Sequence, residues 1–169
     1  MKVDKSSIKI LSELFDYPND EFLINSQKFL LIREDITLLQ QEYTRLFINS
    51  FPTLFCPPYA SYYLEGVIKG LTTLKIEELY EKYGFTPKNG VADFISLELE
   101  FLYFLLNLIE YNDIKEIVEK DLIFLLNHLT YWTNSFFKDI IKYTKIDFYK
   151  ELAKKADFLL HKLHVSYAA

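Results

Sequence analysis

Residues 93–110, DFISLELEFLYFLLNLIE, decide the fold class. Apolar side chains recur in this stretch at the three- and four-residue spacing of an α-helix, and they form two adjacent stripes. The first stripe is Ile95, Leu99, Leu102, Leu106 and Ile109, and the second is Phe94, Leu97, Phe101, Leu105 and Leu108. A helix with so wide an apolar surface is buried on most of its sides. The stretch therefore predicts a central helix surrounded by other helices.

The rest of the chain has the same helical spacing, and no segment alternates between apolar and polar residues as a half-buried strand does. Asp35, Asp93 and Asp147 are predicted N-caps, of helices ending near Phe47, Glu110 and Leu163 respectively. Further helices are expected from Ser6 or Ser7 to Phe15, from Asp20, over 59–69, from Thr72 or Thr73 to Tyr83, over 113–127, and over 128–143 with a kink at its start. Pro52, Pro57 and Pro58 exclude regular structure over 49–58. We predict an all-α, single-domain helical bundle of about eight to ten helices over residues 1–169.

Composition narrows the function classes. The chain has 169 residues, half of them hydrophobic, which is enough for one well-packed domain. The net charge is −5, and residues 93–121 carry eight acidic but only two basic side chains, which argues against nucleic acid as a partner. No apolar run reaches the roughly 18 residues of a membrane span, and no apolar signal segment follows Met1. We therefore expect a cytoplasmic protein without stable membrane insertion.

Catalytic and metal-binding patterns are weak. The single cysteine, Cys56, excludes an internal disulfide, and no neighbouring cation or histidine in the sequence would activate its thiol. His161 and His164 are one helical turn apart and would suit a metal-dependent bundle enzyme, but no third ligand is evident, so a surface pair is the better interpretation. Phosphate-binding and nucleophile-elbow motifs are absent from the sequence. We predict no enzymatic activity, no cofactor and no metal.

The polar residues of the central helix, Asp93, Ser96, Glu100, Tyr103 and Asn107, lie along one narrow line between the apolar stripes, and Glu98 does not lie on this line. Helical geometry places it between Phe94, Leu102 and Leu105, where an unpaired carboxylate would be costly. It must therefore pair with a cation or face a polar groove. Arg45 is one of only two arginines in the chain, and we expect it to form a structural ion pair with Glu98.

Three segments carry a resemblance to a known family: EYTRLF at 42–47, PPYASYY at 57–63 and DFISLELEFL at 93–102. Together with His128-Leu129 and Trp132 they resemble the TorD/DmsD family of redox-enzyme maturation chaperones, over roughly residues 8–160. The resemblance implies an all-α chaperone that binds the twin-arginine leader, or the unfolded apoenzyme, of a molybdopterin-dependent oxidoreductase. It implies that the client precursor is held until its cofactor is inserted. Some members form domain-swapped dimers, which leaves a homodimer open.

The motif positions carry over residue by residue. The Pro-Pro-Tyr element of the family corresponds to Pro57, Pro58 and Tyr59, its Asp-His pair to Asp93 and Phe94, and the following acidic residue to Glu98. This chain departs from the family pattern at Phe94, where histidine is usual, and at Ala92, where proline is common. The ligand preference, the client oxidoreductase and nucleotide binding stay open.

The chemistry of a twin-arginine leader indicates what its receptor needs. Two guanidinium groups beside an apolar segment require carboxylates next to an apolar, aromatic surface. Asp93 and Glu100 lie within about 20° of each other on the helix and could supply the charge. The predicted leader-binding set is Pro57, Pro58, Tyr59, Tyr62, Tyr63, Asp93, Phe94, Glu98 and Glu100. In the alternative interpretation Asp93 is only an N-cap and the tyrosines are core residues, and the protein is a helical adaptor or regulator without leader specificity.

Overall fold

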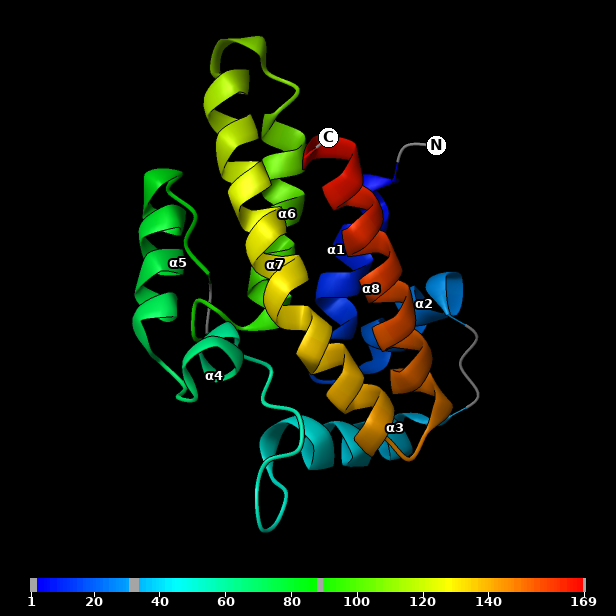
Figure 1. The fold of residues 1–169 in the computed structure, drawn as a ribbon. Coiled ribbons are helices and arrows are strands. Elements are labelled where there is room, and N and C mark those ends of the chain that lie inside the picture. Colours follow the sequence, from blue (N-terminus) through cyan, green and yellow to red (C-terminus); the bar gives the residue numbers. More distant parts are fainter. Residues whose placement is uncertain (1–2, 31–33, 88–89, 169) are drawn as a thin grey trace.

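A computed structural model of the chain describes residues 3–30, 34–87 and 90–168, and this part of the protein is built from α-helices with no extended strands (Figure 1). The all-α prediction is confirmed. Eight α-helices are present in the described residues. They are α1 (Lys5–Leu14), α2 (Asp20–Phe29), α3 (Ile36–Tyr43), α4 (Ala60–Glu65), α5 (Leu71–Lys82), α6 (Ile95–Leu108), α7 (Lys115–Tyr143) and α8 (Asp147–Ala168).

The central helix predicted from residues 93–110 is α6. It packs against α1 and α7, while α8 runs along α7 and completes the bundle (Figure 1). Side chains of both apolar stripes, among them Leu99, Phe101, Leu102 and Leu105, are inaccessible to solvent. Truncating one such leucine to alanine typically costs about 2–5 kcal/mol, so α6 contributes a large part of the core's stability. Among the described residues, no helix combines the length and apolar character that crossing a membrane requires.

Helix α3 is linked to the junction between α7 and α8 by a buried ion pair. Asp35 caps α3 as predicted, and the chain continues from α3 into one wider π-helical turn, Thr44–Ile48. Arg45 contacts both oxygens of the Glu42 carboxylate at 2.8 and 2.7 Å and also donates to the Tyr143 carbonyl at 2.6 Å. Glu42 in turn accepts from the Lys145 backbone N–H at 2.7 Å. One carboxylate thus joins segments about a hundred residues apart.

Two helix boundaries differ from the expectation. One differs because another side chain is the cap, and the other because a glycine ends the helix early. Asp4, not Ser6 or Ser7, caps α1 by accepting from the Ser6 N–H. Helix α4 ends at Glu65 because Gly66 adopts a left-handed conformation, φ 77°, so the helix expected over 59–69 is shorter. The Glu65 carboxylate then accepts from the N–H groups of Leu71 and Thr72 at 2.8 and 2.6 Å and caps α5.

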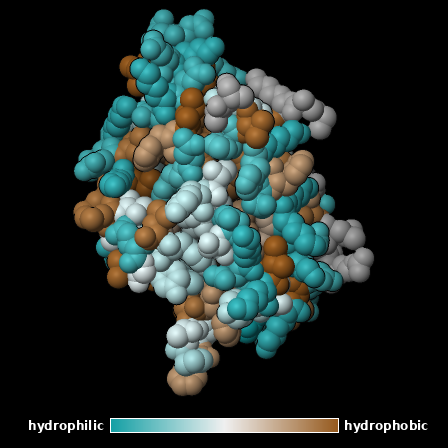
Figure 2. Space-filling view, viewed as in Figure 1, coloured by the Kyte–Doolittle hydropathy of each residue, from teal (hydrophilic) through white to brown (hydrophobic). Residues whose placement is uncertain are grey.

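Helix α7 is continuous. The helix expected over 113–127 does continue over 128–143 as predicted, because no glycine or proline interrupts residues 115–143. The irregular segment expected over 49–58 is confirmed. It projects from the lower end of the bundle, with Phe51 93% exposed, and an apolar tip is visible in Figure 2.

Candidate functional site

The two motif segments that lie about thirty residues apart in the sequence meet in space. Tyr59 and Phe94 form an isolated antiparallel bridge. In it the Ile95 N–H donates to the Pro58 carbonyl at 3.0 Å, and the Ala60 N–H donates to the Asp93 carbonyl at 3.1 Å. The rings of Tyr59 and Phe94 are half-buried, with centroids 5.6 Å apart. Pro57 and Pro58 are buried and therefore position this bridge rather than face solvent.

Asp93 is a buried cap of α4, not the N-cap of α6 that its position in the sequence suggests. Its carboxylate is fully inaccessible to solvent. It accepts from the Ser61 N–H at 2.7 Å and from the Thr73 hydroxyl at 2.8 Å, which fixes the start of α4 against α5. Phe94 occupies the N-cap position of α6. Both carboxylate oxygens of Asp93 have protein donors, so no ligand can reach them without rearrangement.

The expected Arg45–Glu98 ion pair is wrong. Glu98, with 0% exposure, contacts His128 Nε2 at 2.8 Å and accepts from Trp132 Nε1 at 3.0 Å. Arg45 instead pairs with Glu42, three residues before it, and reaches the end of α7. The buried carboxylate does have a basic, hydrogen-bonding partner, as its burial requires. That partner comes from α7.

Protonation of the Glu98–His128 pair determines its contribution to stability. Burial raises the pKa of Glu98, opposed by the His128 and Trp132 contacts. Burial lowers the pKa of His128, but the charge and hydrogen bond of Glu98 outweigh it, so that the pKa of His128 is raised. A group whose pKa is higher in the folded state stabilises the fold while it is protonated, and this contribution is lost as the pH rises through that pKa.

We therefore expect the free energy of unfolding to fall as the pH rises from the ordinary histidine value of 6.5 towards alkaline values, by at most about 1.4 kcal/mol per pH unit for one proton. Urea denaturation at a series of pH values measures it. The His128→Gln variant lacks the titrating ring and should lose this slope, whereas His161→Gln, at an exposed position, should keep it. An identical slope in wild type and His128→Gln would contradict the assignment.

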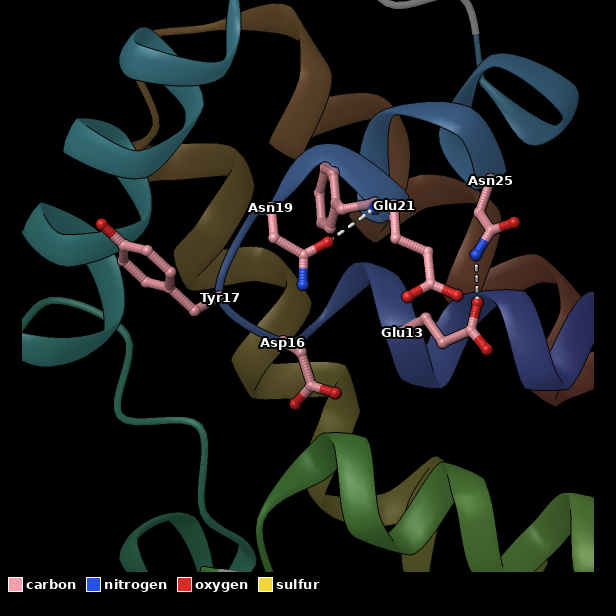
Figure 3. Close-up of a pocket in the computed structure, with 7 residues that line it drawn as sticks. Glu13, Asp16, Tyr17, Asn19, Glu21 and Asn25 are labelled. Carbon is pink, nitrogen blue, oxygen red and sulfur yellow. Dashed lines mark hydrogen bonds between the residues drawn. The ribbon is translucent and has the colours of Figure 1, made fainter.

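Glu100 lies on the opposite side of α6 from Glu98, facing α1. Its carboxylate is 3.4 Å from Lys9 Nζ. Beyond Lys9 lies a small pocket of about 200 Å³ between α1 and α2, here called the α1–α2 pocket, which Figure 3 shows with the carboxylates of Glu13, Asp16 and Glu21 around it. Burial raises the pKa of Asp16, and the nearby charge of Glu100 adds to this rise. A hydrogen bond from Ser96 acts in the opposite direction. The structure thus separates Glu100 from Asp93, the carboxylate with which it was predicted to act.

Tyr62 and Tyr63 have different environments. Tyr62 is exposed on α4. Tyr63 is half-buried, donates its hydroxyl to Asp139 at 3.0 Å, and stacks on Trp132 with ring centroids 5.8 Å apart. Of the predicted tyrosines, Tyr59 and Tyr62 therefore retain accessible ring surface, whereas Tyr63 links α4 to α7.

Helix α5 forms one wall of two concave surfaces. On one side it meets residues 85–87 and 90–92 in a pocket of about 330 Å³, here called the α5 pocket, which Glu77, Tyr80, Glu81, Phe85, Thr86, Pro87, Gly90 and Ala92 line. On the other side it meets α7 in a groove of about 390 Å³, here called the α7 groove. Figure 2 shows hydrophobic residues exposed along this edge of the molecule.

Comparison with known proteins identifies the family. The profile of the nitrate reductase delta subunit family matches residues 14–138, which is well over half of the chain. The chain belongs to the nitrate reductase delta subunit family. The match includes the Tyr59–Phe94 bridge, the Glu98–His128–Trp132 contacts and both walls of the α7 groove.

A solved structure agrees with this family. A protein from Archaeoglobus fulgidus, assigned to redox enzyme maturation, is similar over 95% of this chain and 96% of its own, with 29% sequence identity and a TM-score of 0.70. No curated protein matches the chain. Both the family and the structural neighbour indicate redox-enzyme maturation as the general role, and the resemblance seen in the sequence is confirmed at that level.

The histidines of the last helix do not form a metal centre with other ligands in the described part of the chain, where no three His, Cys, Asp or Glu side chains cluster suitably. His161 Nδ1 lies 3.1 Å from an Asp157 carboxylate oxygen, and His164 Nε2 lies 2.6 Å from Asn127 Oδ1. Burial raises the pKa of the Cys56 thiol well above its usual range, which leaves it protonated and unreactive.

Sequence reasoning missed the residues of α5. Glu77 and Glu81 stand one turn apart and on one side of Tyr80, a spacing that identifies a shared helical face. Nothing in the sequence distinguishes this pair from Glu78, which does not line the pocket. Only the tertiary contact of residues 85–87 and 90–92 with α5 makes the difference. Within the family, these positions are therefore candidates that the motifs alone do not reveal.

Proposed function

We propose that this protein is a cytoplasmic chaperone for the assembly of a molybdopterin-dependent oxidoreductase. It binds the twin-arginine leader of the catalytic-subunit precursor, or the apoenzyme, until the cofactor is inserted, and it performs no chemistry itself. Residues 1–169 act as one chaperone domain. The observation that carries the proposal is membership of the nitrate reductase delta subunit family, supported by end-to-end similarity to a protein assigned to redox enzyme maturation.

We place the arginine-binding part of this site in the α5 pocket. Glu77 and Glu81 line the pocket from successive turns of α5, both are exposed, and neither forms an ion pair in the described part of the chain. Tyr80, Phe85 and Ala92 supply apolar wall beside them. An apolar segment that carries guanidinium groups requires carboxylates next to an apolar surface, because each guanidinium can bind a carboxylate through two hydrogen bonds.

The α5 pocket adjoins the segment that the motifs single out. Ala92 lines the pocket and directly precedes Asp93 and Phe94. The half-buried rings of Tyr59 and Phe94 extend aromatic surface from this point. In this proposal Asp93 and Glu98 support the site from within the fold, and the leader contacts Glu77, Glu81 and these rings.

The test is the dissociation constant of a twin-arginine leader peptide for the wild type and for Glu77→Gln/Glu81→Gln. We expect the double variant to bind at least about tenfold more weakly, because two charge-assisted contacts are lost. A leader with both arginines changed to lysine should also bind more weakly to the wild type.

Two controls are matched to this experiment. Glu78→Gln changes an exposed carboxylate of the same helix that does not line the pocket, and should leave affinity unchanged. Asp16→Asn/Glu21→Gln removes two carboxylates from the α1–α2 pocket, and a loss confined to that variant would move the arginine site there. Equal affinity for the arginine and lysine peptides would instead favour an adaptor without leader specificity.

A further inference from the structure

The α7 groove has apolar walls that are open to solvent. Leu64 of α4, Ile76 of α5, and Phe124 and Tyr131 of α7 line it. Phe124 is 48% exposed and Tyr131 is 76% exposed. Rings held this openly beside a concave surface are typical of a binding site for an apolar segment.

The polar groups of this groove are mainly donors. Lys75 lines it and makes no hydrogen bond or close ion pair in the described part of the chain, although its charge also acts on the exposed Glu65 carboxylate outside the groove. Asn127 also lines it; its Oδ1 is occupied by His164, which leaves its Nδ2 amide hydrogens for a ligand. His128 turns Nε2 towards Glu98, so that Nδ1 is the ring nitrogen left without a partner among the described residues.

No aspartate or glutamate is among the described residues that line the groove. Glu98, the carboxylate that His128 contacts, is fully buried, and both of its oxygens are engaged by His128 and Trp132. Glu98 therefore holds the imidazole ring and favours its protonated form, in which Nδ1–H is a donor. Three donors within apolar walls complement an oxygen anion carried on an apolar segment, and the ammonium of Lys75 repels an arginine pair.

We propose that the α7 groove binds an apolar polypeptide segment of the client through an Asp or Glu carboxylate, which accepts from Lys75, Asn127 and His128. The inference rests on the proposed function only in taking the segment from the same client, and it uses a different surface from the α5 pocket. The protein thus has two sites of opposite charge preference on the two sides of α5.

The probe is a short Leu/Ala-rich peptide with one central Glu, compared with twins that carry Gln or Lys in its place. Fluorescence anisotropy of the labelled peptides gives affinities, and Trp132, the single tryptophan, lies buried beside Glu98, which contacts the groove residue His128, so its emission gives a second readout. We expect the Glu peptide to bind about tenfold more tightly than the Gln peptide, because a charge-assisted contact is at stake. The Lys peptide should bind most weakly.

Variants of the groove residues test which side chains cause the preference for the Glu peptide over the Gln peptide. Lys75→Ala should reduce the Glu-over-Gln ratio severalfold, and Asn127→Asp, nearly the same shape with an added negative charge, should abolish it. Lys120→Ala is the matched control, since it removes one exposed lysine one turn from Phe124 outside the groove, and it should keep the full ratio. His128→Gln should also lower the ratio, but Lys75→Ala and Asn127→Asp decide the question because both residues lie at the groove surface.

Several results would overturn the proposal: equal affinity for the Glu and Gln peptides, an unchanged ratio in Lys75→Ala and Asn127→Asp, or no peptide binding. Octanoate binding as tightly as the Glu peptide would make a free carboxylic acid the occupant instead. Self-association of the chain that Asn127→Asp abolishes would assign the groove to a second copy. Leader binding measured on the same preparations, through Glu77 and Glu81, separates these failures from a failure of the proposed function.

Discussion

Replacing Asp93 with alanine is expected to lower the free energy of unfolding by about 3 kcal/mol, because the start of α4 loses a buried charged acceptor. The Ser61 N–H and the Thr73 hydroxyl both donate to this carboxylate and would be left without a partner. For a chain of this size the loss corresponds to roughly a 10 °C lower Tm. Chemical denaturation and calorimetry measure both quantities.

Graded variants separate the two hydrogen bonds. Thr73→Val removes one donor and should lower the free energy of unfolding by about 1 kcal/mol. Asp93→Asn keeps one acceptor, so its cost should lie between those of Thr73→Val and Asp93→Ala. The leader affinity of the folded Asp93→Asn protein should equal that of the wild type. A normal Tm combined with lost leader affinity would return Asp93 to the binding surface.

Replacing Glu42 with alanine is expected to cost about 3 kcal/mol, the lower end of the range for breaking a buried ion pair from one side, because Glu42 is buried but Arg45 is 24% exposed. The change leaves Arg45, the Lys145 N–H and the Thr144 hydroxyl without their shared acceptor. The junction of α7 and α8 would lose its connection to α3. Urea denaturation at neutral pH measures the loss.

The chain provides a matched control for Glu42. Glu151 and Lys154 form a pair of the same spacing, three residues apart, but both are about half exposed. Glu151→Ala should therefore change stability by less than about 1 kcal/mol. If both substitutions cost the same, burial would not be the source of the Glu42 contribution.

Acid titration provides a second check on Glu42. Burial alone would raise its pKa, but hydrogen bonds from Arg45, Lys145 and Thr144 and the charge of Arg45 outweigh burial, so that the pKa is lowered. A lowered pKa gives stability above the ordinary carboxyl value of 4.5, which is lost as the pH falls through the folded-state value. The difference between wild type and Glu42→Ala should therefore shrink in acid.

The sequence was sufficient for the elements whose signal is local. The double apolar stripe of 93–110 predicted the central helix because helical periodicity is visible within a few turns. Asp35 predicted the start of α3 because a cap acts on the next turn. For Cys56 the sequence offered no activating neighbour, whereas in the structure burial raises the pKa of the thiol by more than the charge of Arg45 lowers it.

Long-range partners could not be read in the same way. The need of Glu98 for a cation follows from its apolar neighbours, but the choice of His128 over Arg45 depends on which face of α7 meets α6. Asp93 precedes a helix as an N-cap does, yet the backbone bridge of Tyr59 and Phe94 turns it towards α4. In both cases the residue type was informative, and the tertiary register decided its partner.

The Tyr59–Phe94 bridge also determines which part of the chain can change in sequence without disturbing the rest of the fold. Residues 59 and 94 lie side by side at this bridge, so that the segment between them starts and ends at one point. Helix α4 of this segment packs against α7, and α5 forms one wall of both concave surfaces. Insertions or substitutions there can remodel what the protein recognises without rerouting the helices that keep it folded.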